Sequence, residues 1–434
     1  MSSTNNLIIN KSKPLIGNLK IPGDKSISHR SIILGVLSNG ELTISNFLNS
    51  DDCNATISAM RQLGADISVD HNEVHIRGKG LFSLKKPRQI IDAGNSGTLI
   101  RLLTGVLAAQ DFDSTITGDE SLMKRPMRRI IKPLEYCGAK IEAHEYKAPL
   151  SIYGSSSLKP IEYDQDIASA QVKSCLILSA LYISGQSTFY EHIQTRDHTE
   201  NLLEHLSYKI NRESNSLSLK GGQNLIAKDI VIGSDISSAA FFIVACLIVD
   251  GSCIEMHSIN INKFRTGIIT VLREMGADIE IFNVKKVSNE LIGTIKVRYS
   301  KLKCTNIRGE IIPSLIDELP ILFIACATAS GTSKITGIEE LRHKESDRIM
   351  AMENGLRAIG INVCSSRDSI EITGGKITGG KVNSYDDHRI AMSFAIAGLI
   401  SENSLTIMDT QNIQTSFPSF VTILRELGVE IFEV

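Results

Sequence analysis

The sequence has no large excess of charge of either sign. Its 434 residues carry 46 Lys and Arg against 48 Asp and Glu, a formal net charge of −2. Proteins that bind nucleic acid or membrane surfaces usually have a strong basic excess, so we expect neither partner. The longest apolar run, 239–249, is well short of the ~18–20 residues that span a bilayer, and residues 1–6 show no export signal. These absences favour a cytoplasmic protein.

Paired cysteines and several common catalytic signatures are also missing. The eight cysteines are scattered without a CxxC pair, and several lie in apolar runs, as expected of reduced, buried thiols. The chain contains no HExxH, GxxxxGK, GxGxxG or GxSxG motif. These absences give no support to a zinc site, a P-loop nucleotide site or a dinucleotide cofactor.

The chain does contain a repeated sequence motif, in which the end of a predicted helix is followed by glycine and then by a strand with apolar residues at every second position. Five copies cover residues 60–69, 134–143, 272–281, 356–363 and 424–431, and a copy at 202–210 lacks the glycine. Glycine suits the left-handed position that ends a helix. The copies recur roughly every 70 to 85 residues, which indicates a repeated structural unit.

Each unit also contains a second, more apolar helix. We expect these helices at Ser96–Ala109, Ala168–Ile183, Ser237–Val249, Ile316–Ala329 and Asp387–Ile400. A polar turn and a β-rich segment follow each one, so the unit is βαβαββ. Six units predict an α/β (α+β) fold with two similar lobes of three units. One lobe would be 22–234; the other would be 1–21 plus 235–434, because 7–19 resembles a strand left over for the distant lobe.

Polar residues open several of the predicted helices. In the first half they are Lys25 to Arg30, Asp92 to Thr98 with Arg101, the cationic run Lys124 to Arg129, Ser169 to Lys173 and Arg196 to Thr199. A helix start has unpaired N–H groups and a partial positive charge, so added cations and hydroxyls make it suitable for an anion. Taken singly, each stretch would also fit an ordinary helix cap or a solvated face.

The second half adds carboxylates to such stretches. They lie in the pair Asp317-Glu318, in the run Arg342 to Arg348 and in the run Asp386 to Arg389. Each would also fit a helix cap or a surface ion-pair cluster. Together they place acids that can move protons beside cations that can hold anions.

Nine short phrases between Pro22 and Pro418 resemble the 5-enolpyruvylshikimate-3-phosphate (EPSP) synthase family of enolpyruvyl transferases. In chain order they are PGDKSISHR, GNSGT, KRPM, SAQVKS, RDHTE, DELP, KESDR, DDHRIAM and TSFP. The phrases SAQVKS and RDHTE are similar to the class II branch of the family. The resemblance covers nearly the whole chain.

The resemblance implies two lobes, each with three βαβαββ units around a pseudo-threefold axis. It implies transfer of the enolpyruvyl group of phosphoenolpyruvate to the 5-hydroxyl of shikimate 3-phosphate by addition and elimination. No metal and no organic cofactor is implied, and the family expectation is a monomer. Lobe 22–234 would bind shikimate 3-phosphate, and the other lobe would bind phosphoenolpyruvate and supply acid and base. Gly97 leaves room for the inhibitor glyphosate, so sensitivity is expected.

The resemblance also implies site residues. The catalytic residues would be Lys25, Asp317, as acceptor of the hydroxyl proton, and Glu345, which would move protons at C3. Shikimate 3-phosphate would contact Lys25, Ser26, Arg30, Ser169, Ala170, Gln171, Arg196, Asp317 and Lys344. Phosphoenolpyruvate would contact Lys25, Asn95, Gly97, Arg125, Gln171, Arg348, His388 and Arg389. Thr415 stands where many relatives have a phosphoenolpyruvate-binding lysine.

Two alternatives remain at this stage. The first is the sister enolpyruvyl transferase that acts on UDP-N-acetylglucosamine, which typically has a cysteine in the loop corresponding to Lys124–Arg129. No cysteine is present there. The second is a non-catalytic anion-binding module on the same scaffold, which the acids Asp317 and Glu345 disfavour.

Overall fold

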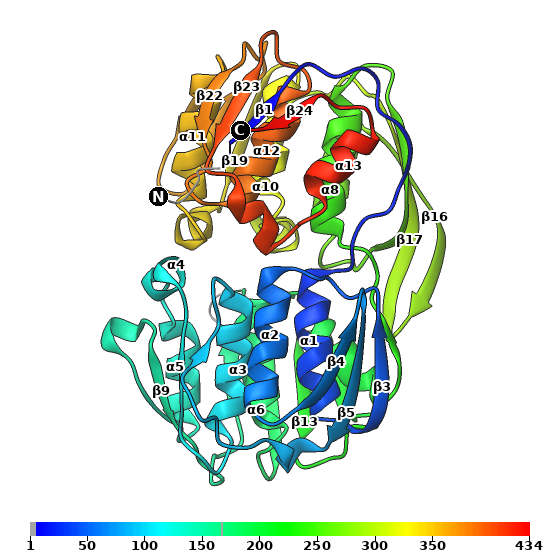
Figure 1. Cartoon of the computed structure of the whole chain (residues 1–434). Coiled ribbons are helices and arrows are strands. Elements are labelled where there is room, and N and C mark those ends of the chain that lie inside the picture. Colours follow the sequence, from blue (N-terminus) through cyan, green and yellow to red (C-terminus); the bar gives the residue numbers. More distant parts are fainter. Residues whose placement is uncertain (1–5, 166–167) are drawn as a thin grey trace. The chain divides into compact units, whose positions relative to one another are not determined.

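A computed structural model of the chain describes residues 6–165 and 168–434. The chain divides into two compact units (Figure 1). The N-terminal unit comprises Gly23–Gly233 and Lys286–Glu290, and the C-terminal unit comprises the chain up to Pro22, Ser234–Lys285 and Leu291–Val434. The predicted lobe of 1–21 plus 235–434 included residues 286–290, which belong to the N-terminal unit in the structure. Most of the N-terminal segment in which we expected no export signal lies outside the described residues.

The helices of the N-terminal unit are α1 (Lys25–Val36), α2 (Asp51–Gln62), α3 (Gly97–Ala108), α4 (Glu120–Lys124), α5 (Arg128–Tyr136), α6 (Ala170–Ala180) and α7 (His198–His205). Those of the C-terminal unit are α8 (Ile236–Ile248), α9 (Gly267–Glu274), α10 (Leu319–Thr328), α11 (Arg348–Ala358), α12 (His388–Gly398) and α13 (Phe420–Glu426). None of these described helices combines the length and the apolar character that crossing a bilayer requires.

Six four-stranded sheets are present among the described residues, three in each unit. The strands of the N-terminal unit are β3 (Asn39–Ser45), β4 (Asp66–Asp70), β5 (Glu73–Lys79), β6 (Ile91–Asp92), β7 (Ser114–Thr117), β8 (Lys140–Glu142), β9 (Leu150–Tyr153), β10 (Glu162–Gln165), β11 (Gln186–Glu191), β12 (Ile210–Arg212), β13 (Ser216–Lys220) and β14 (Ile230–Val231). Those that lie wholly or mainly in the C-terminal unit are β1 (Leu7–Ile9), β2 (Ile16–Leu19), β15 (Cys253–Asn260), β16 (Asp278–Val287), β17 (Glu290–Arg298), β18 (Asn306–Ile307), β19 (Thr332–Thr336), β20 (Asn362–Ser365), β21 (Ser369–Thr373), β22 (Gly380–Asn383), β23 (Leu405–Met408) and β24 (Ile431–Glu433).

All six sheets have the same topology. The strand orders are β14-β3-β5-β4, β6-β7-β9-β8, β10-β11-β13-β12, β2-β15-β17-β16, β18-β19-β21-β20 and β22-β23-β1-β24. In each, the first pair is parallel and the central pair is antiparallel. A parallel pair needs a crossover connection. In four of the sheets a single α-helix lies between the two parallel strands in the chain: α3, α6, α10 or α12. The predicted fold of repeated βαβαββ units in two lobes is confirmed.

The repeated glycines have the backbone conformation that the pattern predicts. Gly64, Gly138, Gly276, Gly360 and Gly428 have φ between 81° and 96°, a region that side chains with a Cβ avoid. In the copy that lacks glycine, Ser207 takes the same position with φ 65°. The helix-to-strand turn is therefore kept in all six copies, at the cost of a strained serine in one.

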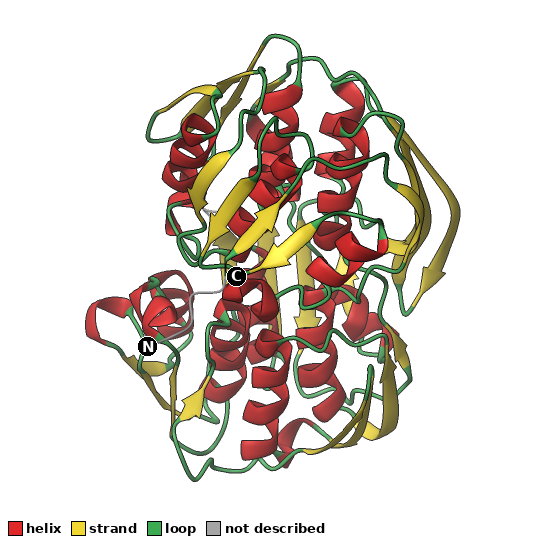
Figure 2. Ribbon diagram, turned by 45° about the horizontal axis from the view of Figure 1, so that its top comes forward, coloured by secondary structure: helices red, strands yellow, loops and turns green. Residues whose placement is uncertain are grey.

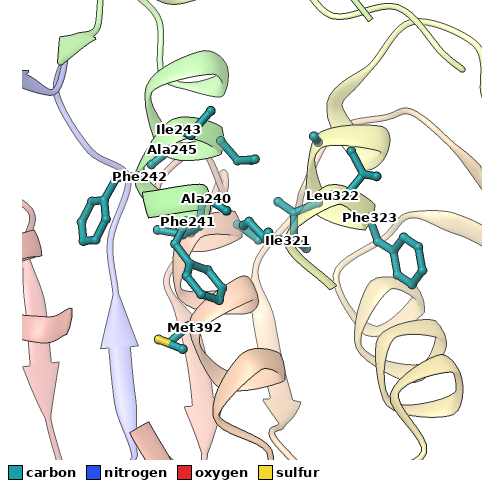
Figure 3. Packing of buried hydrophobic residues seen from close by; sticks show 14 of the residues in the cluster. Ala240, Phe241, Phe242, Ile243, Ala245, Ile321, Leu322, Phe323 and Met392 are labelled. Carbon is teal, nitrogen blue, oxygen red and sulfur yellow. The ribbon is translucent and has the colours of Figure 1, made fainter. Parts of the chain in front are cut away.

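Three apolar helices occupy the centre of each unit. In the C-terminal unit α8, α10 and α12 pack against one another, and Figure 3 shows side chains of all three, including Phe241, Ile321 and Met392, in one cluster. In the N-terminal unit α1 packs against α3, and α3 against α6. Figure 2 shows strands flanking the helices of each unit. These helices are buried almost throughout, and their charged residues lie within the first two turns, where most of the candidate site residues are found.

Candidate functional site

Helix α1 places Lys25 at its first position. Asp24 caps the helix by accepting from the Ile27 backbone N–H at 2.9 Å. The Lys25 ammonium lies 3.1 Å from Asp52 Oδ2, and the two side chains are 16% and 12% exposed. Sequence reasoning did not find Asp52, because an acid in the first turn of a helix, here α2, is usual and carries no further signal. Lys25 is thus a partly buried cation paired with the Asp52 carboxylate.

The start of α3 forms the first cation group. Arg125 Nη2 donates to Asn95 Oδ1 at 2.6 Å, and Asn95 Nδ2 donates to Asp119 Oδ2 at 2.7 Å. A Cβ added to Gly97 would lie 3.1 Å from Arg125 Nη1 and 2.8 Å from Arg101 Nη1. The structure therefore brings Asn95, Gly97 and Arg125 together, and Gly97 lets two guanidinium groups approach the helix start closely.

Helices α3 and α6 are joined at their first turns. Arg101 Nη1 donates to Gln171 Oε1 at 2.7 Å, and Gln171 Nε2 donates to Thr98 Oγ1 at 3.1 Å. Ser169 caps α6 and accepts from Val172 at 3.4 Å, so Ala170 is the first helical residue. The sequence analysis placed Arg101 in the polar stretch that opens this helix but did not assign it to the site.

Arg30 is the most enclosed cation of α1. It is 3% exposed, and it donates to Thr199 Oγ1 and Ser174 Oγ at 2.7 Å each, while its Nη1 donates to the Ser26 carbonyl at 2.9 Å. These bonds tie α1 to α6 and α7. Arg196 lies half-buried just before α7. The N-terminal unit thus gathers cations at the starts of α1, α3 and α7.

Asp317 lies in the turn that precedes α10. The sequence predicted a helix from Ile316, but α10 begins at Leu319 and has Pro320 in its first turn. Asp317 Oδ1 is 3.6 Å from Lys344 Nζ and 3.9 Å from Arg348 Nη1, and its side chain is 18% exposed. Its carbonyl accepts from Arg389 Nη1 at 2.8 Å. The structure thus brings four of the predicted site residues of the C-terminal unit together.

Arg348 is held by carboxylates on three sides. Besides Asp317, Glu345 Oε2 lies 2.6 Å from Nη2, and Asp387 Oδ2 lies 2.7 Å from Nε. Arg348 is 1% exposed. Burial alone would lower its pKa, but the charges of Asp387 and Glu345 raise the pKa above the ordinary arginine value. Arg348 therefore stays a cation, and Glu345, 22% exposed, remains the accessible acid beside it.

Asp387 is a residue that sequence reasoning placed in a motif but not in the site. Its Oδ1 caps α12 by accepting from the Arg389 backbone N–H at 2.9 Å, and its other oxygen holds Arg348 and the Ser346 hydroxyl. The cap was recognisable from an Asp before an apolar helix, but its contact with Arg348 was not. His388, 4% exposed, is the first residue of α12.

The Thr415 hydroxyl donates to the Asn412 carbonyl at 2.7 Å, within a short 3₁₀ turn at Gln411–Thr415. Asp197, His198 and Glu290 form a group of potential metal ligands within the described residues. Its carboxylates already contact protein cations or donors, with His198 Nδ1 2.8 Å from Glu290 and Arg212 3.0 Å from Asp197. We assign no metal to it.

The chain is similar throughout its length to known proteins. The family model described as EPSP synthase (3-phosphoshikimate 1-carboxyvinyltransferase) matches residues 9–424. The 3-phosphoshikimate 1-carboxyvinyltransferase of Methylococcus capsulatus (strain Bath) is 48% identical over 417 residues, which are 96% of this chain and 95% of the relative. That of Coxiella burnetii (strain CbuK_Q154) is 46% identical over 422 residues, 97% of this chain and 96% of the relative. The solved EPSP synthase of Acinetobacter baumannii has a TM-score of 0.89 at 42% identity, with 100% of both chains covered.

Proposed function

The chain belongs to the EPSP synthase family. On this basis we propose which substrate contacts and proton transfers are made by the charged residues of the N-terminal unit and which by those of the C-terminal unit. The reaction that the chain catalyses transfers the enolpyruvyl group of phosphoenolpyruvate to the 5-hydroxyl of shikimate 3-phosphate and releases phosphate. Its sister reaction on UDP-N-acetylglucosamine is not favoured, since the family model and these relatives are named for 3-phosphoshikimate.

We propose that shikimate 3-phosphate binds mainly to the N-terminal unit. Its anionic groups and ring hydroxyls would contact Lys25, Ser26, Arg30, Ser169, Ala170, Gln171 and Arg196, with Asp317 and Lys344 contributed by the C-terminal unit. The supporting observation is that hydrogen bonds connect the starts of α1, α3, α6 and α7, so their cations are preorganised for a polyanion.

Phosphoenolpyruvate would be bound by guanidinium groups. Arg125, Arg348 and Arg389 are forked donors suited to its carboxylate and phosphate, and Lys25, Asn95, Gly97, Gln171 and His388 complete the assignment. We propose no contact from Thr415, because its hydroxyl is engaged within its own turn. Clamping two anions in reactive orientation can supply several kcal/mol of the barrier reduction.

The proton transfers are assigned from the acids of the C-terminal unit. In the addition step the 5-hydroxyl oxygen bonds to C2 of phosphoenolpyruvate, Asp317 accepts the hydroxyl proton with Lys25 as partner, and Glu345 delivers a proton to C3. In the elimination step the C2–O bond to phosphate breaks, C3 returns a proton to Glu345, and the departing phosphate takes up the proton that Asp317 accepted. The observation that carries this proposal is that Asp317 and Glu345 lie around one buried arginine while remaining partly exposed.

The activity is tested by phosphate release from phosphoenolpyruvate. We expect release that depends on shikimate 3-phosphate and none with UDP-N-acetylglucosamine. Release only with the nucleotide sugar would contradict the assignment, and no release with either would support a non-catalytic module.

The proton assignment is tested with Glu345→Gln. We expect turnover to fall at least about 100-fold, because the acid and base at C3 are lost, and substrate-dependent exchange of the C3 protons with D₂O to fall with it. Glu340→Gln is the matched control, since Glu340 lies in the same cluster, 3.4 Å from Lys344. It should retain turnover within about threefold; an equal loss in both variants would contradict a specific role for Glu345.

We also propose that the protein is a cytoplasmic monomer inhibited by glyphosate. The inhibitor is a small anion that would compete with phosphoenolpyruvate beside Gly97 and Arg125. An inhibition constant in the millimolar range would contradict sensitivity, and elution at the size of a dimer in gel filtration would contradict the monomer.

A further inference from the structure

A lysine lies inside the N-terminal unit between two glutamates. The Lys173 side chain, on α6, is 1% exposed, and its Nζ lies 2.9 Å from Glu191 Oε2 and 2.6 Å from Glu200 Oε1. Glu191 ends β11 and Glu200 lies in the first turn of α7, so the cluster joins three elements. Glu200 Oε2 is buried and has no hydrogen-bond partner among the described residues. The proposed substrate contacts use none of these three groups.

The charge state of this cluster excludes a role for Lys173 as a base. Burial alone would lower the pKa of Lys173, but Glu200 and Glu191 raise the pKa above the usual lysine value. Burial raises the pKa of Glu200, partly opposed by the charge of Lys173. A lysine that keeps its proton at neutral pH acts here as a fixed cation and hydrogen-bond donor. A buried charge cluster costs desolvation, so its value must lie in the geometry it imposes.

The geometry it imposes is that of the backbone next to Arg196. Glu191 Oε1 accepts from the Thr195 backbone N–H at 3.1 Å and from its hydroxyl at 2.6 Å, and Lys173 Nζ donates to the Thr195 carbonyl at 3.5 Å. On the other side, Asp197 accepts from Arg212 at 3.0 Å. The half-buried Arg196 is therefore flanked by two anchored residues.

We propose that Lys173, with Glu191 and Glu200, is a positioning group that fixes Arg196 for the binding of shikimate 3-phosphate. The inference rests on the proposed function and extends it to residues that do not touch substrate. His192 to Gln194, which precede the anchored Thr195, are exposed. An exposed loop loses conformational entropy when its arginine binds an anion, and anchoring Thr195 in the folded protein removes part of that loss in advance.

Two variants test the positioning role. The double substitution Lys173→Met with Glu200→Gln keeps the formal charge of the cluster at −1, because one cation and one carboxylate are removed together. Thr195→Val removes only the hydroxyl bond to Glu191. Tyr208→Phe is the matched control: it deletes another hydrogen bond of the same unit, 3.0 Å to the Lys220 carbonyl, at the opposite end of α7.

Steady-state kinetics of the full-length protein separate positioning from general stability. We expect the KM for shikimate 3-phosphate to rise about tenfold in the double variant and about threefold in Thr195→Val, while the KM for phosphoenolpyruvate changes less than about twofold. Tyr208→Phe should leave both KM values unchanged. Equal rises in both KM values, or no rise in either variant with the melting temperature preserved, would overturn the proposal.

A mutant cycle with Arg196→Ala tests whether the effect passes through Arg196. If it does, adding the double substitution to Arg196→Ala causes little further rise in the KM for shikimate 3-phosphate, because the group being positioned is already absent. Fully multiplicative effects would overturn the positioning role. The proposed function fails separately, if the unmodified protein releases no phosphate in the presence of shikimate 3-phosphate.

Discussion

His29 is a buried imidazole one position before Arg30. Its Nδ1 lies 2.6 Å from Thr56 Oγ1, its Nε2 has no hydrogen-bond partner among the described residues, and the side chain is fully buried. Burial and the charges of Lys25 and Arg30 lower the pKa of His29 from 6.5 to about 3. Because the folded state disfavours the proton that the unfolded chain binds below pH 6.5, this contribution to stability is full above that pH and is lost as pH falls from 6.5 towards 3.

We therefore predict that about 2 kcal/mol of the unfolding free energy lost between pH 7 and pH 5 comes from His29. His29→Asn, which can keep the bond to Thr56, should remove this part of the pH dependence in urea unfolding at the two pH values. His71→Asn is the control, since the His71 side chain is 95% exposed. An unchanged pH dependence in His29→Asn would contradict the prediction.

Gly97 controls how closely two guanidinium groups approach α3. Its added Cβ would meet Arg101 and Arg125 at 2.8 Å and 3.1 Å, and both contacts are ends of flexible side chains. We predict that Gly97→Ala displaces these cations, raises the KM for phosphoenolpyruvate about tenfold, raises the glyphosate inhibition constant further and changes the melting temperature little.

Gly138→Ala is the control for Gly97→Ala in enzyme kinetics. Gly138 has φ 96° and nothing within 4 Å of an added Cβ, so this variant should lose stability without any change in KM. If the KM for phosphoenolpyruvate is unchanged in Gly97→Ala, the binding of phosphoenolpyruvate does not require the close approach of Arg101 and Arg125 that Gly97 permits.

At the scale of the element, the six helix-to-strand turns differ in one residue. Ser207 is exposed and has φ 65° where the other copies have glycine. Its hydroxyl accepts a hydrogen bond from the exposed Lys228 side chain. We predict that Ser207→Gly relieves the strain and stabilises the protein by about 0.5–1 kcal/mol, measured by chemical unfolding.

The reverse change supplies the comparison. Gly276 has φ 95°, and the nearest atom to an added Cβ is 3.8 Å away, so Gly276→Ala introduces backbone strain without a clash. It should destabilise the protein by about 1 kcal/mol. If Ser207→Gly also destabilises, the serine bond to Lys228 outweighs the strain.

At the scale of the whole molecule, the two units have separate hydrophobic cores. Leu107 belongs to the core of the N-terminal unit and Leu322, on α10, to that of the C-terminal unit, and both are fully buried. We predict that Leu107→Ala and Leu322→Ala each cost about 2–5 kcal/mol. Hydrogen exchange followed by mass spectrometry should become faster mainly in the unit that carries the substitution. Faster exchange spread evenly over both units would instead indicate one cooperative core.

The sequence by itself determined the repeat, the βαβαββ unit and the helix starts that carry polar residues. These features depend on neighbours within one or two turns: a glycine that ends a helix, an alternating strand, a capping residue. The same local signals located Lys25, Asn95, Asp317 and Arg389, and the resemblance of ordered motifs indicated what they bind.

Only the tertiary structure decided which charges face one another. Asp387 holds Arg348 from 39 positions away, Arg389 reaches the Asp317 carbonyl over 72, and Arg30 reaches Thr199 over 169. No periodicity encodes such pairs, because they form when separate helix starts pack together in one core. For the same reason the sequence showed Lys173 only as one of several polar residues at a helix start. Its position between Glu191 and Glu200 is seen only in the tertiary structure.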